Sequence, residues 1–248
     1  MSAFAALTLC IALPSICMGE PTIDKASVEK IIRDYIVTHP EILIEAMQAA
    51  QRKQEEASAA DTKLLIQAHR AELLEDPNAL VFGNAKGDVT LVEFFDYRCP
   101  YCRQMEGALR KLVQVDPGLR VVQKQFPILG PESVLAARAA LAANKQGKHL
   151  ELHDAFMTRR LSFDEASIMS VAEAVGLNVA QLKIDMASPA VDAEIANSVR
   201  VARALKLKGT PAFIVGAELL PGATDLETLV AIVEDARQSQ KSPTSQSQ

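Results

Sequence analysis

The residues of this chain best suited to chemistry are two cysteines with two residues between them, in the sequence Cys99-Pro100-Tyr101-Cys102. A thiolate is a strong nucleophile, and a second thiol at this spacing can displace whatever the first has captured as a mixed disulfide. The pair therefore suits thiol–disulfide exchange. Two soft sulfur ligands also suit Cu(I), so copper binding by Cys99 and Cys102 is an alternative interpretation.

The four cysteines of the chain divide into two groups. Residues 1–19 contain no charged side chain, and their apolar run ends in small residues, which resembles a secretory signal peptide. We expect cleavage near Gly19, which removes Cys10 and Cys17 and leaves one pair in an exported, periplasmic protein. One pair is too few for a disulfide scaffold or for a zinc site made of four cysteines.

The elements around the pair predict an α/β fold. Residues 89–95 are β-branched and aromatic, with apolar side chains on both faces, which is typical of a central buried strand. The cysteines follow this strand directly and open a helix, and residues 119–127 are predicted to form the next strand of a β-α-β unit. The other predicted strands are residues 80–82, 209–216 and 218–222.

The position of Cys99 at the start of a helix predicts an acidic thiol. Unpaired backbone N–H groups and the helix dipole favour negative charge there, so its pKa should fall below the ~8.5 of a free thiol. Pro100 suits the first helical position, which needs no N–H donor. Cys102 lies one turn deeper, so we expect Cys99 to attack and Cys102 to resolve the mixed disulfide.

Helices are predicted for most of the remaining chain. Residues 131–207 are rich in alanine and lack strand-like alternation, which indicates a helical insertion in the catalytic domain, itself residues 61–237. A last helix is predicted at residues 225–236. The polar tail, residues 238–248, should be disordered.

The segment before the first strand predicts amphipathic helices with no obvious partner in the chain. Apolar residues at helical spacing run from Val28 to Met47, with a break where His39 precedes Pro40. The polar residues 51–61 are typical of a connector, and a further helix follows at residues 62–74. An apolar stripe must pack on something, either the catalytic domain or a second copy of the chain. The connector favours self-association through residues 20–60.

Several classes of function are excluded by what the chain lacks. Its net charge is −5, with no long run of Lys or Arg, which argues against binding nucleic acid. No nucleotide fingerprint is present, and no cofactor is expected. His149 and His153 are spaced for one helix face, but Leu150 stands where a zinc peptidase motif requires Glu. We interpret both histidines as structural residues.

Two segments resemble the DsbA branch of the thioredoxin superfamily: residues 93–102, which end in the cysteine pair, and residues 208–216, which contain Thr210-Pro211. The resemblance covers about residues 79–236. It implies a thioredoxin-like core with an inserted helical domain, as the sequence pattern suggests independently.

The resemblance also implies roles for three further residues. Pro211 is expected to be a cis-proline facing the cysteines, and Thr210 to present backbone groups to a bound peptide. Glu93 matches the buried acid of the family, which can accept or relay the proton of Cys102.

Departures from the family pattern point to a subgroup. Members dedicated to forming disulfides usually carry His between the cysteines and Val before the cis-proline, where this chain has Tyr101 and Thr210. Because Tyr101 lacks the charge that stabilises the thiolate, we expect a milder oxidant. Together with the N-terminal helices, this makes the chain most similar to the ScsC-type suppressor-of-copper-sensitivity proteins, in which such helices oligomerise the catalytic domains.

The subgroup implies an oligomeric disulfide isomerase or reductase, with a trimer favoured, that acts on misoxidised client proteins. Several active sites facing one client raise their effective concentration. A membrane redox partner is expected to reset the cysteine pair. The alternatives are a monomeric DsbA-like dithiol oxidase and a Cu(I)-binding copper-tolerance protein that uses the same thiols.

Overall fold

The computed structural model describes residues 24–76 and 79–241. The predicted signal peptide, residues 1–19, and residues 242–248 of the predicted tail lie outside this range. The chain divides into two compact units, one ending at Glu55 and the other beginning at Glu56. Among the described helices, none combines the length and the apolar character needed to cross a membrane.

The first unit consists of α1 (Lys25–Thr38) and the beginning of α2 (Pro40–Ala68). The interruption predicted at His39 is confirmed, because the residue before a proline avoids helical geometry. The predicted connector, residues 51–61, is instead part of α2, since its Ala, Gln and Glu residues are good helix formers.

The single helix predicted at residues 62–74 is divided between two helices in the structure. Its first part is the end of α2, and its last part is a separate short helix, α3 (Arg70–Leu74). Within residues 62–74 the sequence therefore predicted helix correctly, but it did not predict where α2 ends and α3 begins.

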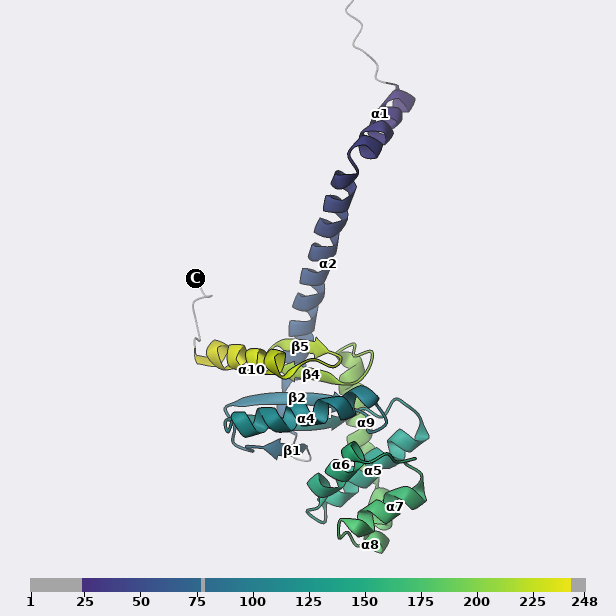
Figure 1. Cartoon of the computed structure of the whole chain (residues 1–248), viewed down its shortest axis with the longest axis vertical. Coiled ribbons are helices and arrows are strands. Elements are labelled where there is room, and N and C mark those ends of the chain that lie inside the picture. The colour runs from purple at the N-terminus through teal and green to yellow at the C-terminus, as the bar shows by residue number, and fades with distance from the viewer. Residues whose placement is uncertain (1–23, 77–78, 242–248) are drawn as a thin grey trace, which may run out of the picture. The chain divides into compact units, whose positions relative to one another are not determined.

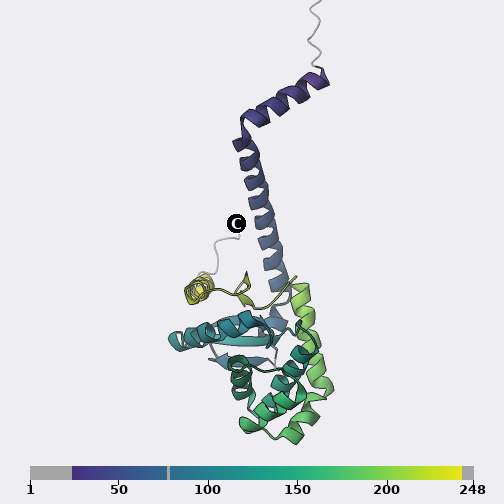
Figure 2. The same ribbon diagram turned by 45° about the vertical axis from the view of Figure 1, so that its right-hand side comes forward.

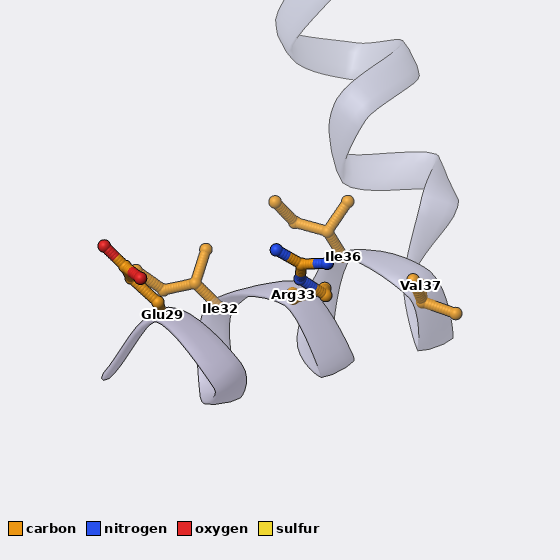
Figure 3. A pocket seen from close by; sticks show the side chains of 5 residues that line it. All are labelled: Glu29, Ile32, Arg33, Ile36 and Val37. Carbon is orange, nitrogen blue, oxygen red and sulfur yellow. The ribbon is translucent and has the colours of Figure 1, made fainter. Parts of the chain in front are cut away.

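No residue of α1 is buried within the described chain. Its apolar side chains gather on one part of its surface, and Figure 3 shows Ile32 and Ile36 pointing to the same side of the helix, with Val37 at its end. Half or more of the surface of Ile32 and two-thirds of that of Ile31 are exposed. The apolar stripe predicted from the sequence is thus present and uncovered.

The second unit is built on a five-stranded mixed sheet in the order β1-β3-β2-β4-β5. Only β2 and β3 are parallel, and α4 (Pro100–Val115) connects them, as the predicted β-α-β unit requires. β4 and β5 form a hairpin whose turn contains Gly216 with a φ of 61°, a conformation that favours glycine. The strands are β1 (Leu80–Gly83), β2 (Val89–Phe95), β3 (Leu119–Gln125), β4 (Ala212–Val215) and β5 (Glu218–Pro221).

Helices cover both faces of this sheet (Figure 1). On one face α4 and α10 (Leu226–Lys241) pack around Leu91 of β2, and on the other α3, α9 (Pro189–Ala204) and the end of α2 pack around Val92 and Phe94. Burial on both faces explains why every residue of β2 except Thr90 and Glu93 is apolar. Because α10 extends to Lys241, residues 238–241 are helical and do not belong to a disordered tail.

Five helices lie between β3 and β4, where the sequence predicts a helical insertion. Four of them form a separate group beside the sheet in Figure 2; the four are α5 (Pro131–Asn144), α6 (His149–Thr158), α7 (Glu165–Ala174) and α8 (Val179–Met186). Their apolar core includes Phe95, Tyr97, Cys99 and Cys102. The cysteine pair therefore lies where the sheet meets the helical insertion, in an α/β fold of the thioredoxin-like kind.

Candidate active site

The start of α4 positions both cysteines. Cys99 is the N-cap residue, with an extended backbone, and Pro100 is the first residue of the helix. Cys102 follows one turn later on the face that α4 buries. Both cysteines are free thiols, and both are covered: 4% of the surface of Cys99 and none of that of Cys102 is exposed.

The surroundings of Cys99 make its thiol acidic. Its pKa is lowered from 9.0 to about 5, chiefly by a hydrogen bond with the Cys102 side chain, while burial acts in the opposite direction. The Thr210 side chain and the backbone N–H groups of Cys102 and Tyr101 lower it further. A sulfur with this pKa is a thiolate at neutral pH, which is the nucleophilic form.

Strand pairing brings Thr210 to the cysteines. β4 runs antiparallel to β2 with Ala212 opposite Phe94, so the residues just before β4 lie at the end of β2 where α4 begins. The Sγ atom of Cys99 lies 3.2 Å from the carbonyl oxygen of Thr210, to which it donates when the thiol is protonated. The Thr210–Pro211 peptide bond is cis. The two segments singled out in the sequence therefore meet in the fold.

Two groups at the site hold their protons, Cys102 of the pair and Glu93 of β2. Burial raises the pKa of Cys102 well above that of an ordinary thiol. Burial also raises the pKa of Glu93 from 4.5 to about 8, and the charge of Glu106 adds to this effect. Neither carboxyl oxygen of Glu93 has a hydrogen-bond partner within the described part of the chain. Glu93 is thus the buried acid that the sequence led us to expect.

Asp96 ties together the two loops at this end of the sheet. One of its oxygens accepts a hydrogen bond from the N–H of Arg98 at 2.8 Å. The other accepts from the N–H groups of Ile128 and Leu129, at 2.9 and 3.0 Å. The loop that carries Cys99 and the loop after β3 are therefore held by one buried carboxylate.

A buried polar cluster adjoins the site and was missed in the sequence. His153 of α6 contacts Glu106 of α4, the Tyr97 hydroxyl and the Gln123 side chain. Glu106 lies four residues after Cys102 on the buried face of α4, and a charged residue within that apolar stripe was the signal that could have revealed it. The sequence interpretation of His149 and His153 as structural residues did not identify these partners.

The donor set at this site consists of two thiols. No group of three or more His, Cys, Asp or Glu residues is placed to hold a metal ion in residues 24–76 and 79–241. The arrangement suits one reaction best: nucleophilic attack by Cys99, followed by displacement by Cys102.

Comparison with known proteins assigns the family. The family model of the DSBA-like thioredoxin domain matches residues 90–234, more than half of the chain. The chain belongs to the DSBA-like thioredoxin family. A second family model, the N-terminal domain of the copper resistance protein ScsC, matches residues 24–57 of this DSBA-like protein.

The solved structures that are similar to this DSBA-like chain include the following two. A thioredoxin-like oxidoreductase from Silicibacter pomeroyi is 46% identical, with a TM-score of 0.67, over 68% of this chain and 98% of that one. ScsC from Proteus mirabilis, in a transitional conformation, is 30% identical, with a TM-score of 0.66, over 87% of this chain and 97% of that one. The likeness to ScsC therefore extends into the N-terminal helices.

Curated relatives of the DSBA-like domain include much longer proteins. The Na(+)/H(+) antiporter NhaA 1 of Salinispora arenicola is 32% identical over 158 residues, which are 63% of this chain and 24% of that protein. The chain thus spans about a quarter of the length of the curated relatives it matches.

Tyr101, like Pro100, is an exposed residue of the motif in this DSBA-like site. Its side chain is 60% exposed, beside a Cys99 that is almost fully covered. Tyr101 is the position at which the chain departs from the His of dedicated oxidases, so no imidazole charge reaches Cys99 from there.

Proposed function

We propose that this chain is a thiol–disulfide oxidoreductase that acts on protein substrates through Cys99 and Cys102. The observation that carries the proposal is the placement of two free thiols at the start of α4, with Cys99 at the N-cap and Cys102 one turn later on the buried face. This placement lowers the pKa of Cys99 to about 5 and raises that of the more deeply buried Cys102. A ready nucleophile next to a protonated resolving thiol lets a mixed disulfide persist long enough to react in either direction.

The exchange conserves atoms and electrons. The Cys99 thiolate attacks one sulfur of a client disulfide, forms a Cys99–client disulfide and releases the other client sulfur as a thiolate. Cys102 then loses its proton and attacks Cys99, which releases the second client thiolate and leaves a Cys99–Cys102 disulfide. The client gains two electrons and the pair loses them. In isomerisation a client thiol attacks the mixed disulfide instead, and Cys99 leaves unchanged.

Glu93 is proposed to take the proton of Cys102 during the resolving step. It is the buried carboxyl group on β2 below the pair, and its ionisation is coupled to that of Cys102. A carboxyl group with a pKa of about 8 is partly ionised near neutral pH, which suits both accepting and returning a proton. Pro100, Tyr101, Thr210 and Pro211 are proposed to shape the surface that a client meets.

The proposed subtype is an oligomeric periplasmic disulfide isomerase or reductase, with a trimer favoured. Support comes from Tyr101 between the cysteines, from the uncovered apolar residues of α1, and from the match of residues 24–57 to the ScsC N-terminal domain. We further propose that residues 20–60 oligomerise the chain, that residues 61–237 carry the chemistry, and that a membrane redox partner resets the pair.

One pair of assays tests the activity and its subtype. The full chain should restore activity to scrambled ribonuclease and should oxidise a reduced dithiol peptide slowly, and Cys99→Ser should abolish both reactions. Fast peptide oxidation without ribonuclease rescue would instead identify a monomeric dithiol oxidase. If Cys99→Ser leaves both reactions unchanged, the proposed function is wrong.

Copper binding by the same thiols is the second candidate, because the N-terminal match is to a domain named for copper resistance. Two thiolates suit a linear Cu(I) site. Titration of the reduced protein with Cu(I), against Cys99→Ser as control, tests it. Tight binding that depends on Cys99 supports this function, and binding no tighter than that of the variant rules it out.

A further inference from the structure

We infer that His153, contributed by the helical insertion, is a positioning residue for the thiol chemistry: it holds the Glu106 carboxylate under the cysteine pair and, through Glu106, governs the proton of Glu93. The inference rests on the proposed function. It adds a residue of α6, outside the sheet and outside the Cys-x-x-Cys helix, to the groups that control the resolving step.

The position of the His153 ring is determined from several sides. Its Nε2 lies 3.1 Å from an oxygen of Glu106, and its Nδ1 lies 3.0 Å from the hydroxyl of Tyr97. The ring packs edge-on against Phe95, with centroids 5.4 Å apart at an angle of 80°. Only 1% of its surface is exposed. These contacts fix the orientation of the ring, so Nε2 faces Glu106 and Nδ1 faces Tyr97.

The proton positions on His153 follow from its partners. Burial raises the pKa of Tyr97, so this hydroxyl keeps its proton, and its oxygen lies 3.0 Å from Nδ1. The carboxylate of Glu106 can only accept, so Nε2 is the donor in the contact between them. The amide nitrogen of Gln123 also lies 3.0 Å from this Nε2, but an NH2 group accepts no hydrogen bond, so the Nε2 proton goes to Glu106. His153 therefore acts as a donor to the carboxylate.

Glu106 is held in its charged form by donors on both oxygens. His153 serves one oxygen, and Nε of Arg110 lies 2.7 Å from the other. Burial of Glu106 favours the neutral acid. The hydrogen bond and the charge interaction with His153, followed by those with Arg110, outweigh this and lower the pKa of Glu106. Removing His153 takes away the largest influence that keeps Glu106 ionised.

The charge of Glu106 acts in turn on Glu93. After burial, it is the strongest influence that raises the pKa of Glu93, and the Cys99 thiolate adds to it. Because that thiolate exists only in the reduced protein, the proton of Glu93 is linked to the redox equilibrium of the pair. The other titratable or charged groups around this cluster are Tyr97, Cys102, His149 and Asp154, the last through its ion pair with Arg110.

His149 provides a matched control one turn earlier on α6. It is also buried, and burial lowers its pKa to about 4, so its ring is neutral. Its Nε2 lies 3.3 Å from the Gln123 oxygen, whereas Glu106 is bonded to His153. Replacing His149 removes a buried imidazole from the same helix and the same cluster while leaving the donor to Glu106 in place.

The test is the equilibrium of the full-length protein with glutathione between pH 5 and pH 9, in the wild type, His153→Leu, His153→Gln and His149→Leu. The equilibrium constant of the wild type with glutathione should change its slope against pH near pH 8, where Glu93 of the reduced form loses its proton. This change of slope is called the break below. In His153→Leu the break should move to lower pH by about one unit, because Glu106 is less often charged. His149→Leu should keep the wild-type break, and so should His153→Gln, which retains an N–H donor.

The outcomes separate this inference from the proposed function. A folded His153→Leu variant with the wild-type break overturns the inference, and so does an equal displacement in His149→Leu. If His153→Leu does not fold, Glu106→Gln replaces it: its neutral amide should lower the break in the same way, and an unchanged break overturns the inference. A wild type that shows no exchange with glutathione at all would instead refute the proposed function.

Discussion

The Sγ atom of Cys99 lies 3.2 Å from the carbonyl oxygen of Thr210, although 111 residues separate the two in the chain. The antiparallel pairing of β2 with β4 makes this contact, because it sets the residues before β4 beside the start of α4. The same pairing brings the Thr210 side chain to Cys99, where it lowers the pKa of the thiol, so the acidity of the nucleophile depends on two segments that only the folded sheet brings together.

Replacing Thr210 should weaken the thiolate without changing the shape of the site. Thr210→Val removes the hydroxyl that lowers the pKa of Cys99 and keeps a side chain of similar volume, so this pKa should rise by up to about one unit. Thiolate absorbance at 240 nm during a pH titration measures the change. Thr210→Ser, which keeps the hydroxyl, should match the wild type; a rise of equal size in both variants would contradict the assignment.

The low pKa of Cys99 should appear in the stability of the reduced protein. A pKa of about 5 in the folded state, against 9.0 for an ordinary thiol, gives a stabilisation that is complete above about pH 9 and is lost as the pH falls through 5. The difference in free energy of unfolding between the reduced wild type and Cys99→Ser should therefore increase from pH 5 to pH 9, by on the order of a few kcal/mol in favour of the wild type. Urea unfolding at several pH values measures this. Parallel curves for the two proteins would be incompatible with a buried thiolate.

Glu93 should have the opposite effect. Its pKa is raised from 4.5 to about 8 in the folded state, so ionising it costs stability progressively between these two pH values. Glu93→Gln removes this cost. Its gain in free energy of unfolding over the wild type should be near zero at pH 4.5 and on the order of a few kcal/mol at pH 8. Resolution of a mixed disulfide should be slower in this variant.

A matched substitution controls for the general effect of removing one carboxylate. Glu173 lies on the exposed side of α7, and Glu173→Gln should leave both the pH dependence of stability and the resolving step unchanged. If both variants behave alike, the buried position of Glu93 has no part in the chemistry.

Charges on the apolar stripe of α1 should lower the mass of the assembly. Ile32 and Ile36 are exposed on one side of the helix, as Figure 3 shows, and Ile32→Glu combined with Ile36→Glu would place charge in the proposed interface. Light scattering should then report a monomer that keeps thiol exchange but has lost ribonuclease rescue. Arg52→Glu, in the polar part of α2, is the control; a double variant of unchanged mass would show that the stripe does not associate.

Tyr101→His should shift the protein towards the behaviour of an oxidase. A cationic imidazole next to Cys99 stabilises the thiolate and hence the reduced form, so the reduction potential should rise by some tens of mV. Equilibration with glutathione measures it, with Tyr101→Phe as the uncharged control. A potential that is the same in all three proteins would mean that position 101 does not set the oxidising strength.

The sheet and the two site segments could be predicted because their signals are local. The apolar run of β2, the Cys-x-x-Cys pair at the start of α4 and the Thr210-Pro211 step before β4 are each contained in about ten residues. Parallel pairing of β2 with β3 followed from the helix that connects them. Strand and helix periodicity records which side chains are buried, and burial is what determines these elements.

The parts that were missed depend on information outside such windows. The polar residues 51–61 have no apolar stripe, and nothing local distinguishes a solvated helix from a connector of the same composition. The bond between Glu106 and His153 joins residues 47 positions apart on two helices. Two histidines four residues apart indicate a shared helix face, but only the packing of α6 against α4 reveals that one of them faces an acid.

The covered position of the nucleophile has a consequence for the choice of reaction partner. Attack on a disulfide requires the two sulfurs of the bond to line up with the incoming thiolate, and Cys99 is almost completely enclosed by its own protein. Under the proposed function, we therefore expect a flexible client segment to react faster than a disulfide fixed in a rigid folded surface.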